Sequence, residues 1–283
     1  MFEFLRRKRI DPRRELQRVL GSYELPSFPA LLNRALDRLR DPDSSLGEVA
    51  KLIESDPGLS QKLISLVNSS AYALRNPVRN VTHAASMLGR AQLEAHLLSA
   101  AVRGVLDRTT EQTGQQRRRF WLSATRRAAA ARAFAAELHP ATQSESFTAA
   151  LLQDMAVPLI LQHRNPTYGQ LLERAQQGEL AVWELEREAY GWDHGDVASW
   201  LCNEWSFPEA LASAIASHHA EIGTEGGLAA VQLAALLLDG DDASDEEHLV
   251  QVAQEACGLA SERTLALLDR CRSEADELAR LLT

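Results

Sequence analysis

Apolar residues recur at helical spacing along most of the chain, and this pattern restricts its fold more than any other feature. Residues 29–40 carry one apolar helical face, formed by Leu31, Leu32, Ala35, Leu36 and Leu39. The alternation of apolar and polar residues that is typical of a half-buried strand is scarce. Helix-start signals recur as well: Ser45 and Glu48 form a capping box, and Asp56 precedes a proline at the first helical position. The sequence therefore predicts an all-α fold.

The periodic segments predict a series of helices separated by polar stretches. Beyond the helices that begin after Ser45 and Asp56, helices are expected at about 81–88, 92–106, 120–138, 145–155, 167–177, 182–189, 194–204, 208–219, 246–257 and 261–282. Residues 71–80 and the acidic residues 239–247 are predicted loops, and the polar residues 107–119 are suited to a boundary between lobes. We expect four parts: a basic N-terminal segment (1–20), an N-terminal helical lobe (21–110), a second helical lobe (111–222) and a C-terminal helical extension (223–283).

Composition disfavours several classes of protein. The chain has 283 residues, of which 45% are hydrophobic, so it can bury a core without disulfides. Its net charge of −9 argues against a protein that coats nucleic acid through bulk positive charge. Neither a signal peptide nor a charge-free apolar run of about 20 residues is found, so no transmembrane helix is expected. Cys202, Cys257 and Cys271 match no zinc motif and favour a reduced, cytoplasmic setting.

Basic residues gather in two stretches. Arg6-Arg7-Lys8-Arg9 is suited to an anionic membrane surface or an acidic partner, although a solvated chain end is the favoured interpretation. The second stretch consists of Arg117, Arg118, Arg119, Arg126 and Arg127. Forked guanidinium groups are suited to a phosphate or a cyclic dinucleotide, but a solvated charge run is the default for such a patch. Residues 57–89 resemble a helix-turn-helix only faintly because the connection is too long, so DNA binding is disfavoured.

Residues 149–161 form an apolar run that is broken by two adjacent polar residues, Gln153 and Asp154. A buried carboxylate without a partner is costly, so Asp154 is expected to pair with backbone donors or with Arg126 or Arg127. The favoured interpretation is a satisfied structural pair, and a surviving ligand-binding role is the alternative.

Several short phrases follow one another in an order that is specific, although each phrase alone is weak. Those of the first half are Leu25-Pro26-Ser27-Phe28-Pro29-Ala30, Asp56-Pro57-Gly58-Leu59, Leu66-Val67-Asn68-Ser69-Ser70-Ala71-Tyr72 and Met87-Leu88-Gly89. Those of the second half are Phe120-Trp121, the run at 149–161, Tyr190-Gly191-Trp192-Asp193-His194, Trp205-Ser206-Phe207-Pro208 and Ile215-Ala216-Ser217-His218-His219. Over about residues 20–222 the chain thus resembles the HDOD family, an HD-related regulatory domain of bacteria. The resemblance implies that the second lobe is a degenerate HD-like helical bundle.

The resemblance also implies where the metal shell of HD-type phosphohydrolases would fall. In those enzymes a His-Asp pair on a buried helix, together with further histidines and a later Asp, holds two cations, and the Asp of the pair bridges them. The matching positions in this chain are Ser123, Gln153, Asp154, His194, His218, His219 and Ala235. At least two of the expected ligands are therefore replaced.

The chemistry of the remaining side chains argues against catalysis. The amide of Gln153 is a poor substitute for a metal-binding imidazole, and Ser123 or Ala235 is a worse one. One Asp with two or three His is sufficient for a mononuclear site, but not for the two-metal clamp that positions water for phosphodiester attack. The sequence therefore predicts no metal, no cofactor and no catalytic residue. Structural roles are favoured for His194, at a helix start, and for His218 and His219, at a helix end where the dipole stabilises them.

The resulting functional prediction is a non-catalytic signal-transduction module of the HDOD type that acts by binding a partner signalling protein. It rests largely on resemblance to the family. Two alternatives stay open. One is a metal-dependent phosphohydrolase with a reduced ligand set, in which Asp154 and His194 act with His218 or His219. The other is a receptor for a cyclic dinucleotide or another nucleotide, held by the arginines between residues 117 and 127.

Overall fold

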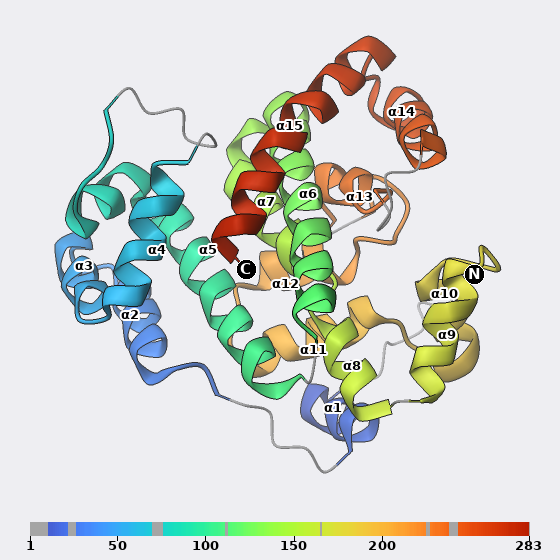
Figure 1. Cartoon of the computed structure of the whole chain (residues 1–283), viewed down its shortest axis with the longest axis horizontal. Helices are drawn as coiled ribbons and strands as arrows, with labels where there is room; N and C mark the ends of the chain where they lie inside the picture. The colour runs from blue at the N-terminus through green and yellow to red at the C-terminus, as the bar shows by residue number, and fades with distance from the viewer. Residues whose placement is uncertain are drawn as a thin grey trace, which may run out of the picture.

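The computed structural model describes residues 11–21, 27–69, 76–110, 113–164, 166–224, 227–237 and 243–282. Over these ranges every regular element is a helix and no strand is present, which confirms the predicted all-α class (Figure 1). None of the described helices combines the length and the apolar character that a membrane crossing needs. Several predicted features lie outside the described residues: the basic run at 6–9, Leu25 and Pro26, residues 71–75 of the first loop, and residues 239–242 of the acidic loop.

The first five helices are α1 (Pro12–Leu20), α2 (Ala30–Arg40), α3 (Leu46–Glu54), α4 (Pro57–Val67) and α5 (Val81–Thr109). Both predicted caps are confirmed. The Ser45 hydroxyl accepts from the Glu48 N–H at 3.3 Å while the Glu48 carboxylate accepts from the Ser45 N–H at 2.8 Å, and Asp56 accepts from the Leu59 N–H at 2.9 Å. Helix α1 is an addition to the predicted set, although Asp11 caps it before a proline in the same way.

Helix α5 contains both helices that were predicted for this region, joined across a break at Gly89. This residue has φ +71° and ψ 179°, a conformation that is essentially restricted to glycine. The next side chain, Arg90, turns back onto the end of α2, where its guanidinium donates to the carbonyl oxygens of Leu39 at 2.5 Å and Asp41 at 3.1 Å. The break therefore locks α5 against the connection between α2 and α3.

The polar stretch at 107–119 is more helical than predicted. Helix α5 continues to Thr109, and α6 (Gly114–Leu138) begins with a second capping box, formed by Thr113 and Gln116. Arg117 in the first turns of α6 lies 3.6 Å from the carboxylate of Asp107 near the end of α5. The connection between the halves is therefore short and is bridged by an ion pair.

The second half continues with a short 3₁₀ helix (Pro140–Thr142) and then α7 (Gln143–Leu152), α8 (Ala156–Arg164), α9 (Thr167–Gln176), α10 (Val182–Tyr190), α11 (His194–Glu204), α12 (Glu209–Ala216), α13 (Ala229–Ala234), α14 (Ala243–Cys257) and α15 (Ser261–Leu282). Two differences from the predicted helices affect the site. Helix α7 ends at Leu152, so Gln153 and Asp154 lie in a turn, and α12 ends at Ala216, so His218 and His219 follow it in a turn.

Most of the buried apolar side chains form one contiguous core, which extends from Leu16 in α1 to Leu278 in α15. In Figure 1, α2, α3 and α4 lie on one side of α5, and α6 runs beside α7 and α15 in the middle of the molecule. Helix α1 is joined to α8 by Arg164, which donates to the carbonyl oxygens of Arg18 and Val19 at 2.8 Å each. The N-terminal and C-terminal helices thus belong to the same packed body as the central ones.

Candidate functional site

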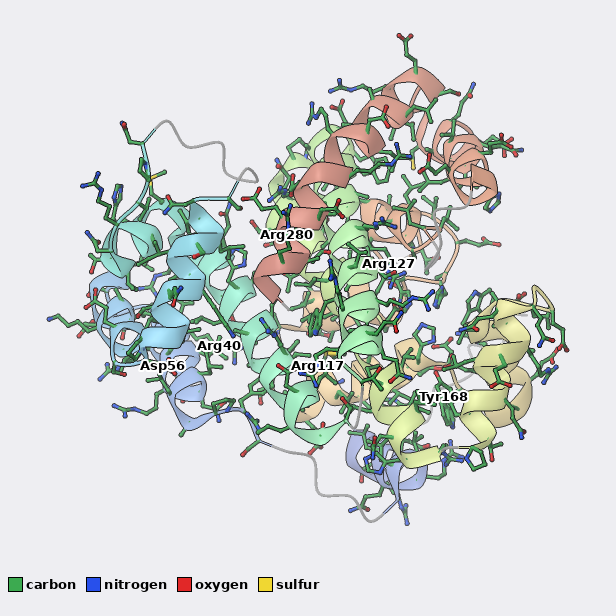
Figure 2. All side chains as sticks on the ribbon, viewed as in Figure 1. Arg40, Asp56, Arg117, Arg127, Tyr168 and Arg280 are labelled. Carbon is green, nitrogen blue, oxygen red and sulfur yellow. The ribbon has the colours of Figure 1, made fainter. Side chains whose placement is uncertain are left out.

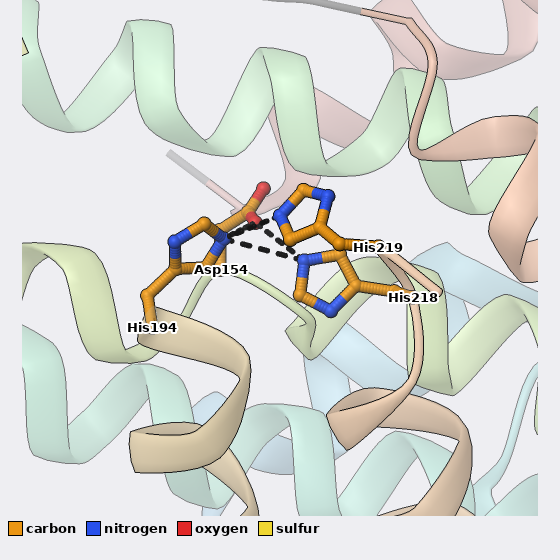
Figure 3. Close-up of side chains that lie close together, drawn as sticks. All are labelled: Asp154, His194, His218 and His219. Carbon is orange, nitrogen blue, oxygen red and sulfur yellow. Dashed lines mark hydrogen bonds and ion pairs between the residues drawn. The ribbon is translucent and has the colours of Figure 1, made fainter. Parts of the chain in front are cut away.

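One carboxylate and three imidazoles converge in the second half of the molecule. Asp154 comes from the turn between α7 and α8, His194 from the first turn of α11, and His218 and His219 from the turn after α12 (Figure 3). One ligand atom of each residue lies within 4.8 Å of the others. We refer to these four residues as the Asp/His cluster. Four of the seven positions that the resemblance assigns to the ancestral metal shell are therefore brought together.

Asp154 faces the cluster from a tight turn, residues 153–155, that separates α7 from α8. The Met155 N–H donates to the Leu152 carbonyl oxygen at 3.0 Å, closing a tight turn at the end of α7. The next helix restarts with a bond of 3.0 Å from the Val157 N–H to the Asp154 carbonyl oxygen. Pro158 has no N–H, so it cannot continue a ladder from the preceding helix. The carboxylate is thus placed at a break between two buried helices.

His194 is held at the start of α11 by the acid that precedes it. Asp193 caps the helix by accepting from the Asp196 N–H at 2.9 Å, and the Arg187 guanidinium fixes the same carboxylate at 2.6 Å. Gly195 allows α11 to approach the turn after α12, because a Cβ there would lie 3.2 Å from Cε1 of His218. A larger residue at this position would push the two segments apart.

The hydrogen bonds on the outer side of the rings determine which nitrogen carries the proton. Nδ1 of His218 lies 2.6 Å from the carbonyl oxygen of Ile215, which can only accept. Nδ1 of His194 lies 2.7 Å from Oε2 of Glu186, a buried carboxylate that also accepts the His194 N–H at 2.8 Å and the Tyr168 hydroxyl at 2.5 Å. Both Nδ1 atoms are therefore donors, and the Nε2 atoms face the cluster.

The cluster is also joined to a buried arginine, as the sequence predicted for Asp154. Nη2 of Arg127 lies 2.5 Å from Oδ2 of Asp154, and Nη1 donates to the Leu237 carbonyl oxygen at 3.1 Å. The other carboxylate oxygen, Oδ1, lies 3.2 Å from Nε2 of His194 and 3.5 Å from Nε2 of His218. Figure 2 shows Arg127 on α6, the helix that carries this guanidinium to the site.

These contacts change the pKa of Asp154, His194 and His219. Burial alone would raise the pKa of Asp154, but the Arg127 charge and hydrogen bonds from two histidines lower it well below its ordinary value. Burial would likewise lower the pKa of His194, but Glu186 and Asp154 raise it to about 10. Burial, together with its two histidine neighbours, lowers the pKa of His219 well below its ordinary value. In the absence of other ions, two cations, Arg127 and His194, thus oppose two anions, Asp154 and Glu186.

The remaining predicted positions supply no further strong ligand. Ser123 is buried in α6, and Ala235 lies at the C-terminal cap of α13. Gln153 is 2% exposed, and its amide oxygen has no hydrogen-bond partner among the described residues. Two cations bridged by Asp154 do not fit this donor set, because Oδ2 is already bound to Arg127. A single cation fits, because Oδ1 and three inward Nε2 atoms are left to bind it.

The predicted arginine patch is divided between two places. Arg127 points into the Asp/His cluster, whereas Arg117 pairs with Asp107. Ten residues of helix separate the two, which is about 15 Å along the axis. Arg118 and Arg119 are exposed near the start of α6, and Arg126 is half-buried.

Three contributors to the site are absent from the sequence prediction. Glu186 and Tyr168 fix His194, as described above. Gln232 in α13 fastens the turn that carries His218 and His219: its amide donates to the carbonyl oxygens of Ser217 at 3.3 Å and Glu221 at 2.9 Å, one on each side of the two histidines. Only Gln232 had a sequence signal, since a polar residue within the apolar segment 228–237 requires a partner.

The described part of the chain is thus an all-α protein with an Asp/His cluster between α7, α11 and the turn after α12. The model of one family, the HDOD domain, matches residues 25–221. The chain therefore belongs to the HDOD family, as the sequence predicted.

Solved structures share this fold. An HDOD domain protein of unknown function from Geobacter sulfurreducens has a TM-score of 0.69 and 22% identity, with coverage of 94% of this chain and 97% of that one. A putative phosphohydrolase from Shewanella amazonensis has a TM-score of 0.73 and 23% identity, covering 95% and 97%. A putative signal transduction protein from Marinobacter aquaeolei has a TM-score of 0.66 and 20% identity, covering 96% of this chain and 65% of that one. No curated protein gives a significant match.

Proposed function

We propose that this chain is a non-catalytic regulatory module of the HDOD type that acts in signal transduction by binding a partner protein. The observation that carries the proposal is the ion pair between Arg127 and Asp154. The guanidinium occupies Oδ2, the carboxylate oxygen that a bridged pair of metal ions would require. Arg127 is 6% exposed, and the second terminal nitrogen of its guanidinium, Nη1, is bound to the Leu237 carbonyl oxygen. The guanidinium therefore has little freedom to move away from Asp154.

The electrostatics of the site support the same conclusion. A second divalent cation beside Arg127 would lie next to a fixed positive charge in a region with little water, where like charges repel strongly. Ser123, Gln153 and Ala235 offer no anionic ligand to offset that repulsion. The module is therefore proposed to act through contacts rather than through hydrolysis of a phosphodiester.

Two further features support a signalling role in the cytoplasm. One of the structurally similar proteins bears the name of a signal transduction protein, and membership of the HDOD family favours such a role for this chain. The three cysteines are free thiols, which agrees with a reducing compartment.

Turnover assays test the absence of catalysis. The purified chain is incubated with bis-p-nitrophenyl phosphate and with a panel of cyclic dinucleotides, in Mg²⁺, Mn²⁺, Zn²⁺ and metal-free buffers. We expect no turnover above that of a heat-denatured control. Turnover that is abolished in Asp154→Asn but retained in His83→Ala, a change at an exposed histidine far from the cluster in sequence, would establish the alternative of a phosphohydrolase with a reduced ligand set.

Affinity purification from the native cell, followed by mass spectrometry, tests the partner-binding part of the proposal. We expect a signalling protein to be enriched reproducibly and to bind the purified chain directly. Calorimetric titration with the nucleotide panel tests the remaining alternative, a nucleotide receptor. Because Arg127 is bound to Asp154 and Arg117 to Asp107, the arginines of α6 do not form one joint phosphate site, and we expect no heat of binding.

A further inference from the structure

We propose that the Asp/His cluster binds one divalent cation of the zinc type, in a closed tetrahedral shell of three nitrogens and one oxygen. The ligands are Nε2 of His194, His218 and His219 and Oδ1 of Asp154. The inference goes beyond the proposed function, because a partner-binding module needs no metal, and it concerns one ion where the ancestral shell held two.

The distances between the donor atoms match the edges of a zinc tetrahedron. Zinc–ligand bonds of 2.0–2.1 Å imply donor atoms about 3.3–3.4 Å apart. Nε2 of His194 lies 3.3 Å from Nε2 of His218, 2.9 Å from Nε2 of His219 and 3.2 Å from Oδ1 of Asp154. Oδ1 of Asp154 lies 3.5 Å from Nε2 of His218. The two remaining edges, from Nε2 of His219 to His218 and to Asp154, lie within 4.8 Å. Closing the shell around one ion therefore requires His219 to move inward by up to about 1.4 Å.

The tautomers of the histidines point to a cation at the centre. His194 and His218 each carry a proton on Nδ1, where Glu186 and the Ile215 carbonyl oxygen accept it. Nε2 of His194, Nε2 of His218 and Oδ1 of Asp154 therefore converge, and this arrangement requires a shared positive charge between them, either a proton on Nε2 of His194 or a metal ion. A buried carboxylate behind a metal-binding histidine is the usual arrangement that orients the ring and makes it a stronger donor.

The supporting contacts hold the ligands in place. The ring of His219 stacks on Trp183 with a centroid separation of 5.6 Å and an interplanar angle of 22°. Gln232 fastens the turn that carries His218 and His219, and Tyr168 fastens Glu186. Such preorganisation reduces the ordering that binding would otherwise require.

The nature of the shell indicates both the ion and its role. Three imidazoles favour Zn²⁺, Co²⁺ or Ni²⁺ over Mg²⁺ and Ca²⁺, which prefer oxygen ligands. Since the protein supplies all four ligands, no position is left for a water nucleophile, as in structural rather than catalytic zinc sites. Arg127 then takes the place of the second cation on Asp154. The ion would tie α7, α11 and the turn after α12 together without giving the chain hydrolytic activity.

Metal analysis of the full chain tests the proposal. Protein stripped with a chelator is dialysed against Zn²⁺ and then against metal-free buffer, and the bound metal is measured by mass spectrometry. We expect one Zn²⁺ per chain in the wild type and in His83→Ala, and a loss of at least tenfold in affinity in His219→Ala. His219 is chosen because it is only partly buried in a turn, and circular dichroism checks that the variant is folded.

Two measurements on the unaltered chain guard against a variant that misfolds. Co²⁺ is expected to give the intense visible absorption of tetrahedral coordination, and Zn²⁺ is expected to raise Tm in a concentration-dependent manner, whereas Mg²⁺ has no effect. Binding that is equally strong in His219→Ala, two ions per chain, an octahedral Co²⁺ spectrum or no binding would each overturn the proposal. If no metal binds, a proton shared between His194 and Asp154 supplies the positive charge at the centre of the Asp/His cluster. Turnover by the loaded protein would instead overturn the proposed function and leave the metal site standing.

Discussion

Several buried charged side chains among the described residues form one connected series. Arg127 binds Asp154, Asp154 contacts His194, and His194 binds Glu186, so that opposite charges alternate from α6 to α10. Breaking a buried pair by removing one partner is strongly destabilising, because the other charge is left without compensation. The stability of the site therefore depends on each member of this series.

Replacement of Arg127 by methionine tests this dependence. Asp154 would keep its buried carboxylate but lose its strongest partner, so we expect Arg127→Met to lower the free energy of unfolding by about 3 kcal/mol. Urea unfolding followed by circular dichroism measures the change. The exposed Arg119, on the same helix, serves as the control: Arg119→Met is expected to change stability by less than about 0.5 kcal/mol. Equal effects at both positions would contradict the inferred role of the pair.

A second prediction at the residue scale concerns His96 and the pH dependence of the free energy of unfolding. Burial and the charge of Arg132 lower the pKa of this ring from 6.5 to about 4. The unfolded chain then binds a proton more readily than the folded chain, so stability is full above pH 6.5 and falls as the pH decreases toward 4. At pH 5 the loss is at most about 2 kcal/mol, since the residue is partly exposed.

The check on His96 is the difference between two proteins. We expect the wild type to lose more stability between pH 7 and pH 5 than His96→Gln, which cannot titrate there, while other acidic groups contribute equally to both. Parallel curves for the two proteins would show that the ring of His96 remains accessible to protons in the folded state.

The sequence predicted some of these partners because the chemistry of a single residue required them. Asp154 lies in an apolar run, so it needed a cation, and an arginine was available on the preceding helix. Glu186 gave no such signal. It lies among other acidic residues on an amphipathic helix, and only the packing of α10 on α11 turns this one carboxylate toward His194. Long-range geometry, rather than residue type, separates the two cases.

At the scale of elements, most helix starts follow from local capping chemistry and the breaks follow from packing. Asp11, Ser45 and Asp56 cap their helices through side-chain contacts with the next turn. The end of α7 is different, since an apolar run with helical residues continues through it. Its break puts Asp154 into the cluster, and a period-based prediction extends the helix across it. Sequence periodicity thus identifies helices well and places functional breaks poorly.

Gly89 provides a test of such a break. A residue with a Cβ is strained at the Gly89 φ of +71° and ψ of 179°. We therefore expect Gly89→Ala to lower the free energy of unfolding by about 1–3 kcal/mol. Gly47, inside α3, is the matched control. A Cβ there meets only the Ser45 hydroxyl oxygen, at 3.8 Å, so Gly47→Ala is expected to raise stability by about 0.5 kcal/mol. Thermal and urea unfolding of the two variants should therefore shift in opposite directions, and a common direction would contradict the assigned conformations.

For the whole molecule, the continuous core means that the predicted parts of the chain are not independent in their packing. Helix α15 lies along α6, where Cys271 and Ala275 pack on Ala129 and Arg132 forms an ion pair with Glu274. The apolar pattern of residues 261–282 predicted this helix but not its location, because an amphipathic face does not identify the surface that covers it. The structure assigns the C-terminal helix a place in the core beside the helix that carries Arg127.

A cavity in α15 is therefore expected to destabilise the whole molecule. Leu267 of α15 is 2% exposed, so we expect Leu267→Ala to lower the free energy of unfolding by about 2–4 kcal/mol through the cavity that it leaves. Because the core is continuous, the loss should displace one cooperative transition, seen equally by far-ultraviolet circular dichroism and by tryptophan fluorescence, with the denaturant slope unchanged. Leu265→Ala, at a position 46% exposed on the same helix, is the control and is expected to have little effect. A second, earlier transition confined to one probe in Leu267→Ala would show that α15 unfolds separately, and that it does not support the helix from which Arg127 reaches the Asp/His cluster.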